Sequence, residues 1–227
     1  MHEATFFDLI VSPNVLPHYV SFAFLASAIL IVTAIVIRVS MSLVPQGIQN
    51  FVEAVAEAMY KLSEENIGHE YGEFFFPLIC TLFMYILLCN FFGLIPGFDS
   101  PTANINVTAS LAVPVFLIYQ IWGFKVHGLR YIRHFLGPIQ SIYALPLMGF
   151  MFLTEIISHL ARPLTLAVRL FGNMFAKHLM LLVLALLLPL FVPDLILFLG
   201  FGISLVQAFV FTLLAAVYIA GAVQEAH

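Results

Sequence analysis

The feature that most constrains this chain is one long apolar stretch, from Pro146 to Pro189. At 1.5 Å per residue, a helix over this stretch would be about 60 Å long, roughly twice the 30 Å thickness of a bilayer core. Such a helix cannot stand upright in a membrane. We therefore expect it to tilt steeply, to bend, with Pro163 as the obvious place, or to lie partly along the surface.

The composition indicates a membrane protein. Of 227 residues, 63% are hydrophobic and only 9% are charged, whereas a soluble domain carries roughly 25% charged residues. A run of about 20 mostly apolar residues predicts one membrane span. The expected fold class is an all-α membrane protein, a single integral membrane domain over 1–227. Its five transmembrane helices are expected at about 20–38, 74–96, 105–124, 146–189 and 194–222, the last two long and tilted.

A more polar segment, Ser40 to Glu73, separates the first two spans. Its apolar residues recur at helical spacing among glutamates, at Ile48, Phe51, Val52, Val55, Met59 and Leu62. That pattern predicts an amphipathic helix at about 46–66, lying on the membrane surface. Basic residues follow the first and third spans, at Arg38, Lys61, Lys125, Arg130 and Arg133. The positive-inside rule therefore predicts an external N-terminus and a cytoplasmic C-terminus.

Arg169 lies within the long apolar stretch, and the nearest acid on that segment is Glu155, fourteen positions away. A guanidinium keeps its charge in proteins, and at a bilayer centre it costs about 3 kcal/mol on the lenient insertion scale. On one helix the two residues would be about 21 Å apart, too far for an ion pair. We expect Arg169 to face a watery cavity or a carboxylate supplied from elsewhere, and so to mark a functional site.

Most other polar residues of this stretch share a face with Arg169. The side chains within about 40° of it on a helical wheel are Glu155, Ser158, Arg162, Thr165 and Asn173. Lys177 lies about 80° away and His178 on the opposite side. A single Ser or Thr in a span usually serves helix packing, and Arg162 is the residue best placed to be structural. A polar stripe about 27 Å long, however, is more than packing requires.

The final span carries a second polar face, formed by Ser204, Gln207 and Tyr218, and Gly200 and Gly202 would allow close backbone approach or make room for water. Two such faces are expected to turn toward each other or toward a shared partner, although Gln207 and Tyr218 could serve an interhelical hydrogen bond alone. An acid near one membrane face, a cation at mid-depth and polar groups toward the other face indicate two separate ion paths. Arg169 would then block a continuous proton leak. His178 is equally compatible with proton exchange and with simple packing.

The motifs at this centre resemble those of a known family. The run Arg162-Pro-Leu-Thr-Leu-Ala-Val168, followed by Arg169-Leu-Phe-Gly-Asn-Met-Phe-Ala176, resembles the signature of the a subunit of F-type ATP synthases. Other residues fit the same pattern: Glu155, Gln207 to Phe209, Tyr218, Asn90 to Pro96 and Asn104 to Thr108. The resemblance covers essentially the whole chain from the first span onward.

The resemblance implies a role for these residues. The family's a subunit is the membrane stator of a rotary motor, and it faces a ring of c subunits that each carry one carboxylate. Arg169 matches the essential arginine that faces this carboxylate and separates two half-channels. The family's layout assigns Asn173, His178 and Gln207 to the outer path, and Glu155 and Ser158 to the inner one. Lys177 and Tyr218 are further candidates, and the supporting residues would be Arg162, Thr165, Ser204, Gly200 and Asn104.

The implied partners are the c-subunit ring, the b subunits of the peripheral stalk, the rest of the F1F0 complex and membrane lipid, without nucleic acid or cofactor. The chain would hold no catalytic site of its own. The Lys and Arg bias and the absence of a targeting peptide favour a bacterial cell (inner) membrane, with an organelle-encoded copy as the alternative. Cys80 and Cys89 fall on opposite sides of a helix, so we expect neither a disulfide nor a metal site.

Two positions depart from the family's common pattern. Many members have Gly-Glu where this chain has Lys177-His178, and many of those carry a histidine at the position of Gly200. We hypothesise that Lys177 fills the space left by Gly200 and modulates proton uptake. A rival interpretation is a secondary transporter with Arg169 binding an anionic substrate, although no internal repeat typical of transporters is found. A second rival, a structural membrane scaffold, predicts that Arg169→Leu is tolerated.

Overall fold

The computed structural model describes residues 17–42, 47–95, 98, 100–128, 145–187 and 192–223. Every regular element in these ranges is a helix, which confirms the all-α class. In chain order the elements are α1 (His18–Val39), α2 (Ile48–Ile67), α3 (His69–Phe92), the short 3₁₀ helix η2 (Pro101–Ala103), α4 (Ile105–His127), α6 (Leu145–Leu187) and α7 (Val192–Val223).

Five of these helices are long and apolar enough to cross a membrane, namely α1, α3, α4, most of α6 and most of α7. The chain is therefore a multi-pass membrane protein. Helix α3 begins at His69, earlier than the expected Phe74, so Glu70 lies in its first turn, where the helix dipole favours a carboxylate. The expected end of this span at Pro96 lies outside the described residues, as do Arg130 and Arg133.

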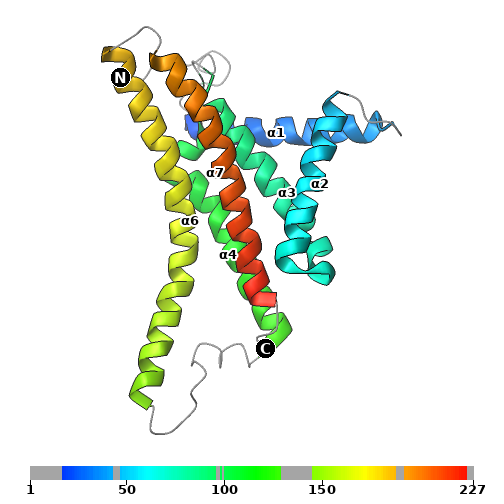
Figure 1. The fold of residues 1–227 in the computed structure, drawn as a ribbon, viewed down its shortest axis with the longest axis vertical. Helices are drawn as coiled ribbons and strands as arrows, with labels where there is room; N and C mark the ends of the chain where they lie inside the picture. The colour runs from blue at the N-terminus through cyan, green and yellow to red at the C-terminus, as the bar shows by residue number, and fades with distance from the viewer. Residues whose placement is uncertain are drawn as a thin grey trace.

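Helix α6 is one continuous element of 43 residues that passes through Pro163. Its length of about 65 Å exceeds the bilayer core roughly twofold, so it must run obliquely. Helix α1, with 22 residues, has the length of an upright span. In Figure 1, α6 and α7 extend side by side along the long axis of the molecule, and α1 runs across their direction. This arrangement fits one upright span beside two strongly inclined helices.

The main core lies where α3, α4 and α7 meet the inner face of α6. Its fully buried side chains include Ile86 of α3, Val115 of α4, Leu170 of α6 and Phe211 of α7. Helix α7 contributes several alanines to this core, at Ala208, Ala215, Ala216, Ala220 and Ala222. Small residues let helix backbones approach closely in a membrane. This close packing holds α7 between α6 and the α3–α4 pair.

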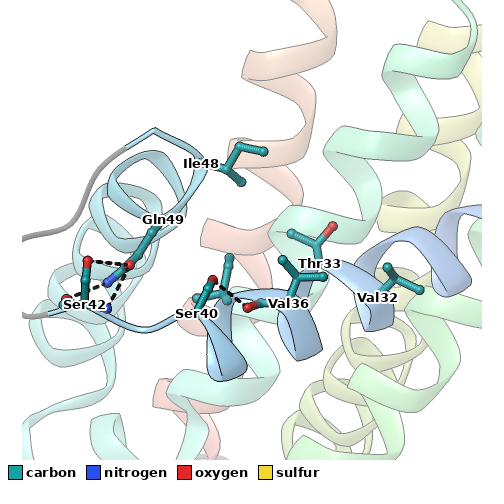
Figure 2. A pocket seen from close by; sticks show the side chains of 8 residues that line it. Val32, Thr33, Val36, Ser40, Ser42, Ile48 and Gln49 are labelled. Atoms are coloured by element: carbon teal, nitrogen blue, oxygen red, sulfur yellow. Dashed lines mark hydrogen bonds between the residues drawn. The ribbon is translucent and has the colours of Figure 1, made fainter.

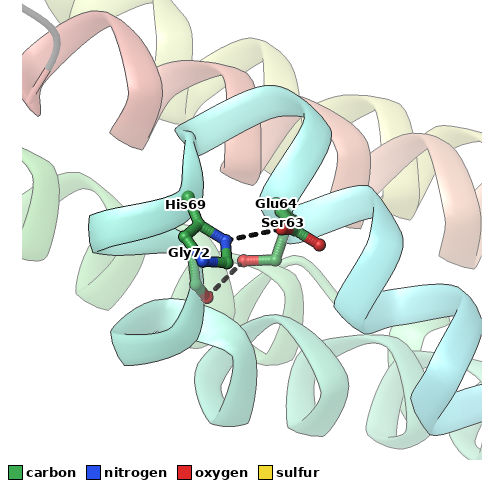
Figure 3. A network of polar contacts seen from close by, with 4 residues as sticks. All are labelled: Ser63, Glu64, His69 and Gly72. Atoms are coloured by element: carbon green, nitrogen blue, oxygen red, sulfur yellow. Dashed lines mark hydrogen bonds and ion pairs between the residues drawn. The ribbon is translucent and has the colours of Figure 1, made fainter.

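Helix α2 is amphipathic, as expected, and packs along α3 (Figure 1). Met59, Leu62 and Ile67 are buried, whereas Glu57 and Lys61 are exposed. The chain turns sharply into α3 at Gly68, whose φ of 96° favours glycine. Around this corner Ser63 Oγ donates to the Gly72 carbonyl at 2.8 Å, and His69 Nδ1 lies 2.6 Å from Glu64 Oε1 (Figure 3).

Candidate functional site

Helix α6 places Arg169 on its open side. The buried face of the helix carries His159, Leu166, Leu170, Met174 and Lys177, which pack toward the other helices. Arg169 is exposed, as are Ser158, Thr165 and Asn173, while Glu155 and Arg162 are half-buried. The polar stripe therefore runs beside the buried face, at the edge of the helix packing. Within the described part of the chain, Arg169 makes no hydrogen bond or ion pair.

The two predicted polar faces meet on one side of Arg169. Asn173 Nδ2 donates to Gln207 Oε1 across the α6–α7 contact at 2.6 Å. Gln207 is only 4% exposed, and its Nε2 atom finds no hydrogen-bond acceptor among the described residues. A buried amide donor without an acceptor costs about 1–3 kcal/mol. This position is therefore suited to an ordered water molecule.

Lys177 lies deeper, in a buried polar cluster formed by α3, α6, α7 and η2. Its Nζ atom lies 3.4 Å from Ser204 Oγ and 3.5 Å from the Asn90 carbonyl oxygen, both neutral acceptors. A Cβ atom at Gly200 would come within 3.0 Å of Lys177 Cδ. The Lys177 side chain thus occupies the space that Gly200 leaves open, which is the packing that the sequence led us to expect.

The same cluster continues into the α3–α4 connection. The Asn90 side chain is fully buried, donates to the Ser204 carbonyl at 3.2 Å and accepts from Thr102 Oγ1 at 2.6 Å. Ser100 Oγ lies 2.8 Å from Thr102 Oγ1 and donates to the Cys89 carbonyl at 3.0 Å. These residues form a connected chain of hydroxyl and amide groups that ends at Lys177.

A second polar cluster lies on the other side of Arg169, toward the start of α6. Glu155 Oε1 lies 3.3 Å from His159 Nε2. The Arg162 guanidinium lies over the Tyr218 ring of α7, 5.4 Å from its centroid. Tyr119 of α4 lies between, with its ring centroid 6.1 Å from His159 and 6.2 Å from Tyr218. The structure therefore brings Glu155, Arg162 and Tyr218 into one region.

The remaining predicted residues have more local surroundings. Thr165 Oγ1 donates to the Arg162 carbonyl at 3.0 Å, a contact within the helix. Asn104 is the N-cap of α4 and accepts from the Asn106 backbone N–H at 2.9 Å, which is a structural role. Ser158 is exposed and His178 is half-buried.

Sequence reasoning missed His159, Tyr119, Thr102 and Ser100 as members of these clusters. The position of His159, four residues after Glu155, was a readable signal, because side chains at that spacing are neighbours on a helix. Asn90 was noticed only as part of a motif. No sequence pattern connects Thr102 with Asn90, because their contact depends on how the α3–α4 connection folds back.

A separate pocket of about 520 Å³ lies between the end of α1 and the start of α2. Figure 2 shows Val32, Val36, Ser40, Ser42, Ile48 and Gln49 around it. Its polar groups are engaged with each other or with backbone: Gln49 Nε2 donates to the Ser42 carbonyl and Ser40 Oγ to the Val36 carbonyl. None of its lining residues titrates and none belongs to the predicted site, so we place the candidate site at the α6–α7 seam.

Comparison with known proteins identifies the family of the chain. A profile described as ATP synthase A chain matches residues 20–220. ATP synthase subunit a of Geobacter sulfurreducens is 45% identical over 208 residues, covering 92% of this chain and 88% of the relative. The subunit a of Trichlorobacter lovleyi is 44% identical over 88% of this chain and 84% of the relative. With a matching family profile over most of the chain and relatives of this identity and coverage, the chain belongs to the ATP synthase A chain family.

Proposed function

We propose that this chain is the stator subunit of the membrane sector of a rotary ATP synthase, and that it carries protons to and from ring carboxylates through two offset half-channels. The observation that carries the proposal is the environment of Arg169. Its guanidinium is exposed beside a helix seam, has no counter-charge in the described part of the chain, and lies between two separate polar clusters.

The surface around Arg169 supports a protein partner with a carboxylate. Exposed apolar side chains lie on both helices of this seam: Leu164, Val168 and Phe175 of α6, and Val206 and Phe209 of α7. A permanent charge in such a surface needs a counter-charge, because its solvation by lipid is poor. A ring of c subunits would supply one carboxylate after another, together with an apolar surface of its own.

The outer half-channel would run through the cluster around Asn173, Gln207 and Lys177. The unsatisfied Gln207 Nε2 atom provides a binding position for water next to the Asn173–Gln207 contact. The hydroxyl groups of Ser100, Thr102 and Ser204 extend this polar route away from Arg169. His178, which follows Lys177 in the sequence and is half-buried, would take part near the outer end of this half-channel.

The inner half-channel would begin at Glu155 and Ser158. Both lie on the stripe that Arg169 shares, and Glu155 remains partly accessible. Arg169 between the two routes would favour the ionised ring carboxylate and would repel a proton that moved directly from one route to the other. The distribution of Lys and Arg indicates that the inner route faces the cytoplasm and that the N-terminus lies outside. The membrane would be the inner membrane of a bacterium. The b subunits of the peripheral stalk would hold the stator in place.

A secondary transporter with an anionic substrate on Arg169 fits these observations less well. A transporter would bind its substrate in a concave pocket, whereas Arg169 is an exposed side chain on the open side of α6.

The test is Arg169→Ala in the assembled enzyme, measured as ATP-driven acidification of inverted membrane vesicles. We expect pumping to disappear while the subunit still co-purifies with the complex. Arg38→Ala is the matched control, because Arg38 is an exposed arginine in the last turn of α1 and should leave pumping unchanged. Pumping that persists in the Arg169→Ala enzyme would refute the proposal.

A further inference from the structure

A buried histidine contacts the side chain of Glu155. His159 is only 8% exposed, and its Nε2 atom lies 3.3 Å from Glu155 Oε1. The side chain of Glu155 is 35% exposed and that of His159 is 10% exposed. The carboxylate is thus the accessible member of the pair, and the imidazole is the enclosed one.

The backbone carbonyl of His159 is held by a hydrogen bond from another helix. Pro163 has no N–H group, so the His159 carbonyl oxygen loses the hydrogen bond that an α-helix would supply from four residues later. The Tyr119 hydroxyl donates to this oxygen instead, at 3.3 Å. The rings of Tyr119 and His159 also lie against each other, with centroids 6.1 Å apart. Helix α4 therefore holds the residue whose imidazole contacts Glu155.

The ionisable groups around His159 come from three helices. Glu155 and Arg162 lie on α6 itself, Tyr119 on α4 and Tyr218 on α7. Arg162 lies over the Tyr218 ring, which engages its charge. Among these groups, Glu155 is the acid that contacts the imidazole. Two titratable groups at this distance can pass a proton from one to the other.

We propose that His159 is a positioning residue for proton release, which orients the Glu155 carboxylate and shares its proton on the inner half-channel. This inference rests on the proposed function. A ring carboxylic acid would lose its proton and remain as a carboxylate facing Arg169. The proton would bind the Glu155–His159 pair, reside on oxygen or on Nε2, and pass to water on the inner side. Only O–H and N–H bonds form and break.

An imidazole suits this position because its Nε2 atom can bind a proton and release it again, as the Glu155 carboxylate can. The pair therefore offers the inner route two proton-binding groups in place of one. The consequence is a dependence of transport on the pH of one side of the membrane only.

The experiment uses His159→Gln in the full complex, in inverted vesicles whose external buffer bathes the cytoplasmic side. Glutamine preserves a polar group but does not titrate. We expect proton flux to fall by less than the roughly 100-fold typical of a directly acting proton-transfer group. We expect the dependence of proton flux on external pH to flatten, because one of the two proton-binding groups of the pair is gone. The dependence on luminal pH should stay as in the wild type.

Two control variants distinguish the loss of the His159 imidazole from a structural effect on the helices around it. His69→Gln removes a histidine that also contacts a glutamate, at 2.6 Å, but at the exposed first residue of α3; it should leave both pH profiles unchanged. Tyr119→Phe removes the hydroxyl that binds the His159 carbonyl but keeps the imidazole. It should lower assembly or flux without flattening the profile.

Further variants keep the inference testable if His159→Gln fails to assemble. Glu155→Gln should flatten the same external pH profile, and the double variant should be no worse than the worse single one, because the pair acts as a unit. A wild-type profile in either single variant, additive losses in the double variant, or an effect confined to luminal pH would each overturn the inference. If Arg169→Ala still pumps, the proposed function itself fails; if Arg169→Ala is inactive and His159→Gln has the wild-type profile, only the role of His159 fails.

Discussion

Asn173 Nδ2 lies 2.6 Å from Gln207 Oε1, although 34 positions separate the two residues in the chain. The contact joins the polar faces of α6 and α7 beside Arg169. It is the direct structural link between the family's central motif and the last helix. The amide of Gln207 is buried, so its oxygen depends on this one donor within the described residues.

Asn173→Ala is therefore expected to destabilise the α6–α7 contact by about 1–3 kcal/mol, the cost of a buried polar group without a partner. Gln207→Leu removes both the oxygen and the unsatisfied nitrogen, so the double variant should lose less stability than the sum of the two single variants. The measurement is the fraction of the subunit that stays in the detergent-solubilised complex on heating. Strictly additive losses would mean that the two side chains are not coupled.

Gly200→Ala is expected to displace the Lys177 side chain, because the added Cβ would lie 3.0 Å from Lys177 Cδ and 3.2 Å from Leu94 Cδ2. Overpacking of this kind typically costs about 1–3 kcal/mol. The control is Gly202→Ala on the same helix, where an added Cβ would meet no atom within 4 Å. Heat-induced loss of the subunit from the complex should rise for Gly200→Ala only, and should return toward the wild-type level in Lys177→Gly/Gly200→Ala.

Lys177→Gly by itself tests the role of the ammonium group in proton uptake. Its neighbours Ser204 and Asn90 provide neutral oxygen acceptors, so no buried carboxylate of this cluster would be left without a counter-charge. We expect assembly to persist and the pH profile of proton-driven ATP synthesis to change. An unchanged profile across pH would show that Lys177 only fills space beside Gly200.

Gly72→Ala should strain the corner between α2 and α3. The added Cβ would lie 3.0 Å from the Glu64 Cα atom and 3.2 Å from the Ser63 carbonyl oxygen, which are backbone atoms and cannot rotate away. The same corner contains the Ser63–Gly72 hydrogen bond (Figure 3). We expect lower thermal stability of the complex, by about 1–3 kcal/mol. Gly221→Ala in α7, where nothing lies within 4 Å, should have no such effect.

The Glu57–Lys61 pair on α2 predicts a titration effect outside the membrane spans. A hydrogen bond from the Lys61 ammonium, 2.7 Å away, holds the pKa of the Glu57 carboxyl below its ordinary value. Because the native pKa is depressed, the pair's contribution to stability is present above the ordinary pKa. It is lost as pH falls through the lower native pKa. Both side chains are largely exposed, so the contribution is small and screened by salt.

Lys61→Met should return the Glu57 pKa to its ordinary range, and high salt should act in the same direction. Carboxyl NMR titration of the reconstituted protein would measure both effects. An unchanged Glu57 pKa in Lys61→Met would show that the ion pair does not form in the reconstituted protein.

The sequence by itself determined the fold class and the membrane spans, and it singled out Arg169 as a charge that needs a partner. Apolar runs must become helices in a bilayer, since every backbone polar group there needs an internal partner. The helical period alone placed Arg169 on a polar stripe, and a guanidinium that cannot lose its charge required an explanation. The sequence did not predict that α3 begins as early as His69. The helix starts there because Gly68 turns the chain with a positive φ, and this backbone angle cannot be read from the sequence.

Only the tertiary structure decided which groups lie together. Asn90 and Thr102 meet Lys177 and Ser204 through the packing of α3, η2 and α7, and Tyr119 reaches the His159 carbonyl from α4. Such contacts join residues 12 to 114 positions apart. The spacing of residues along one helix carries no information about them, because it fixes which face a side chain occupies but not which other helix covers that face.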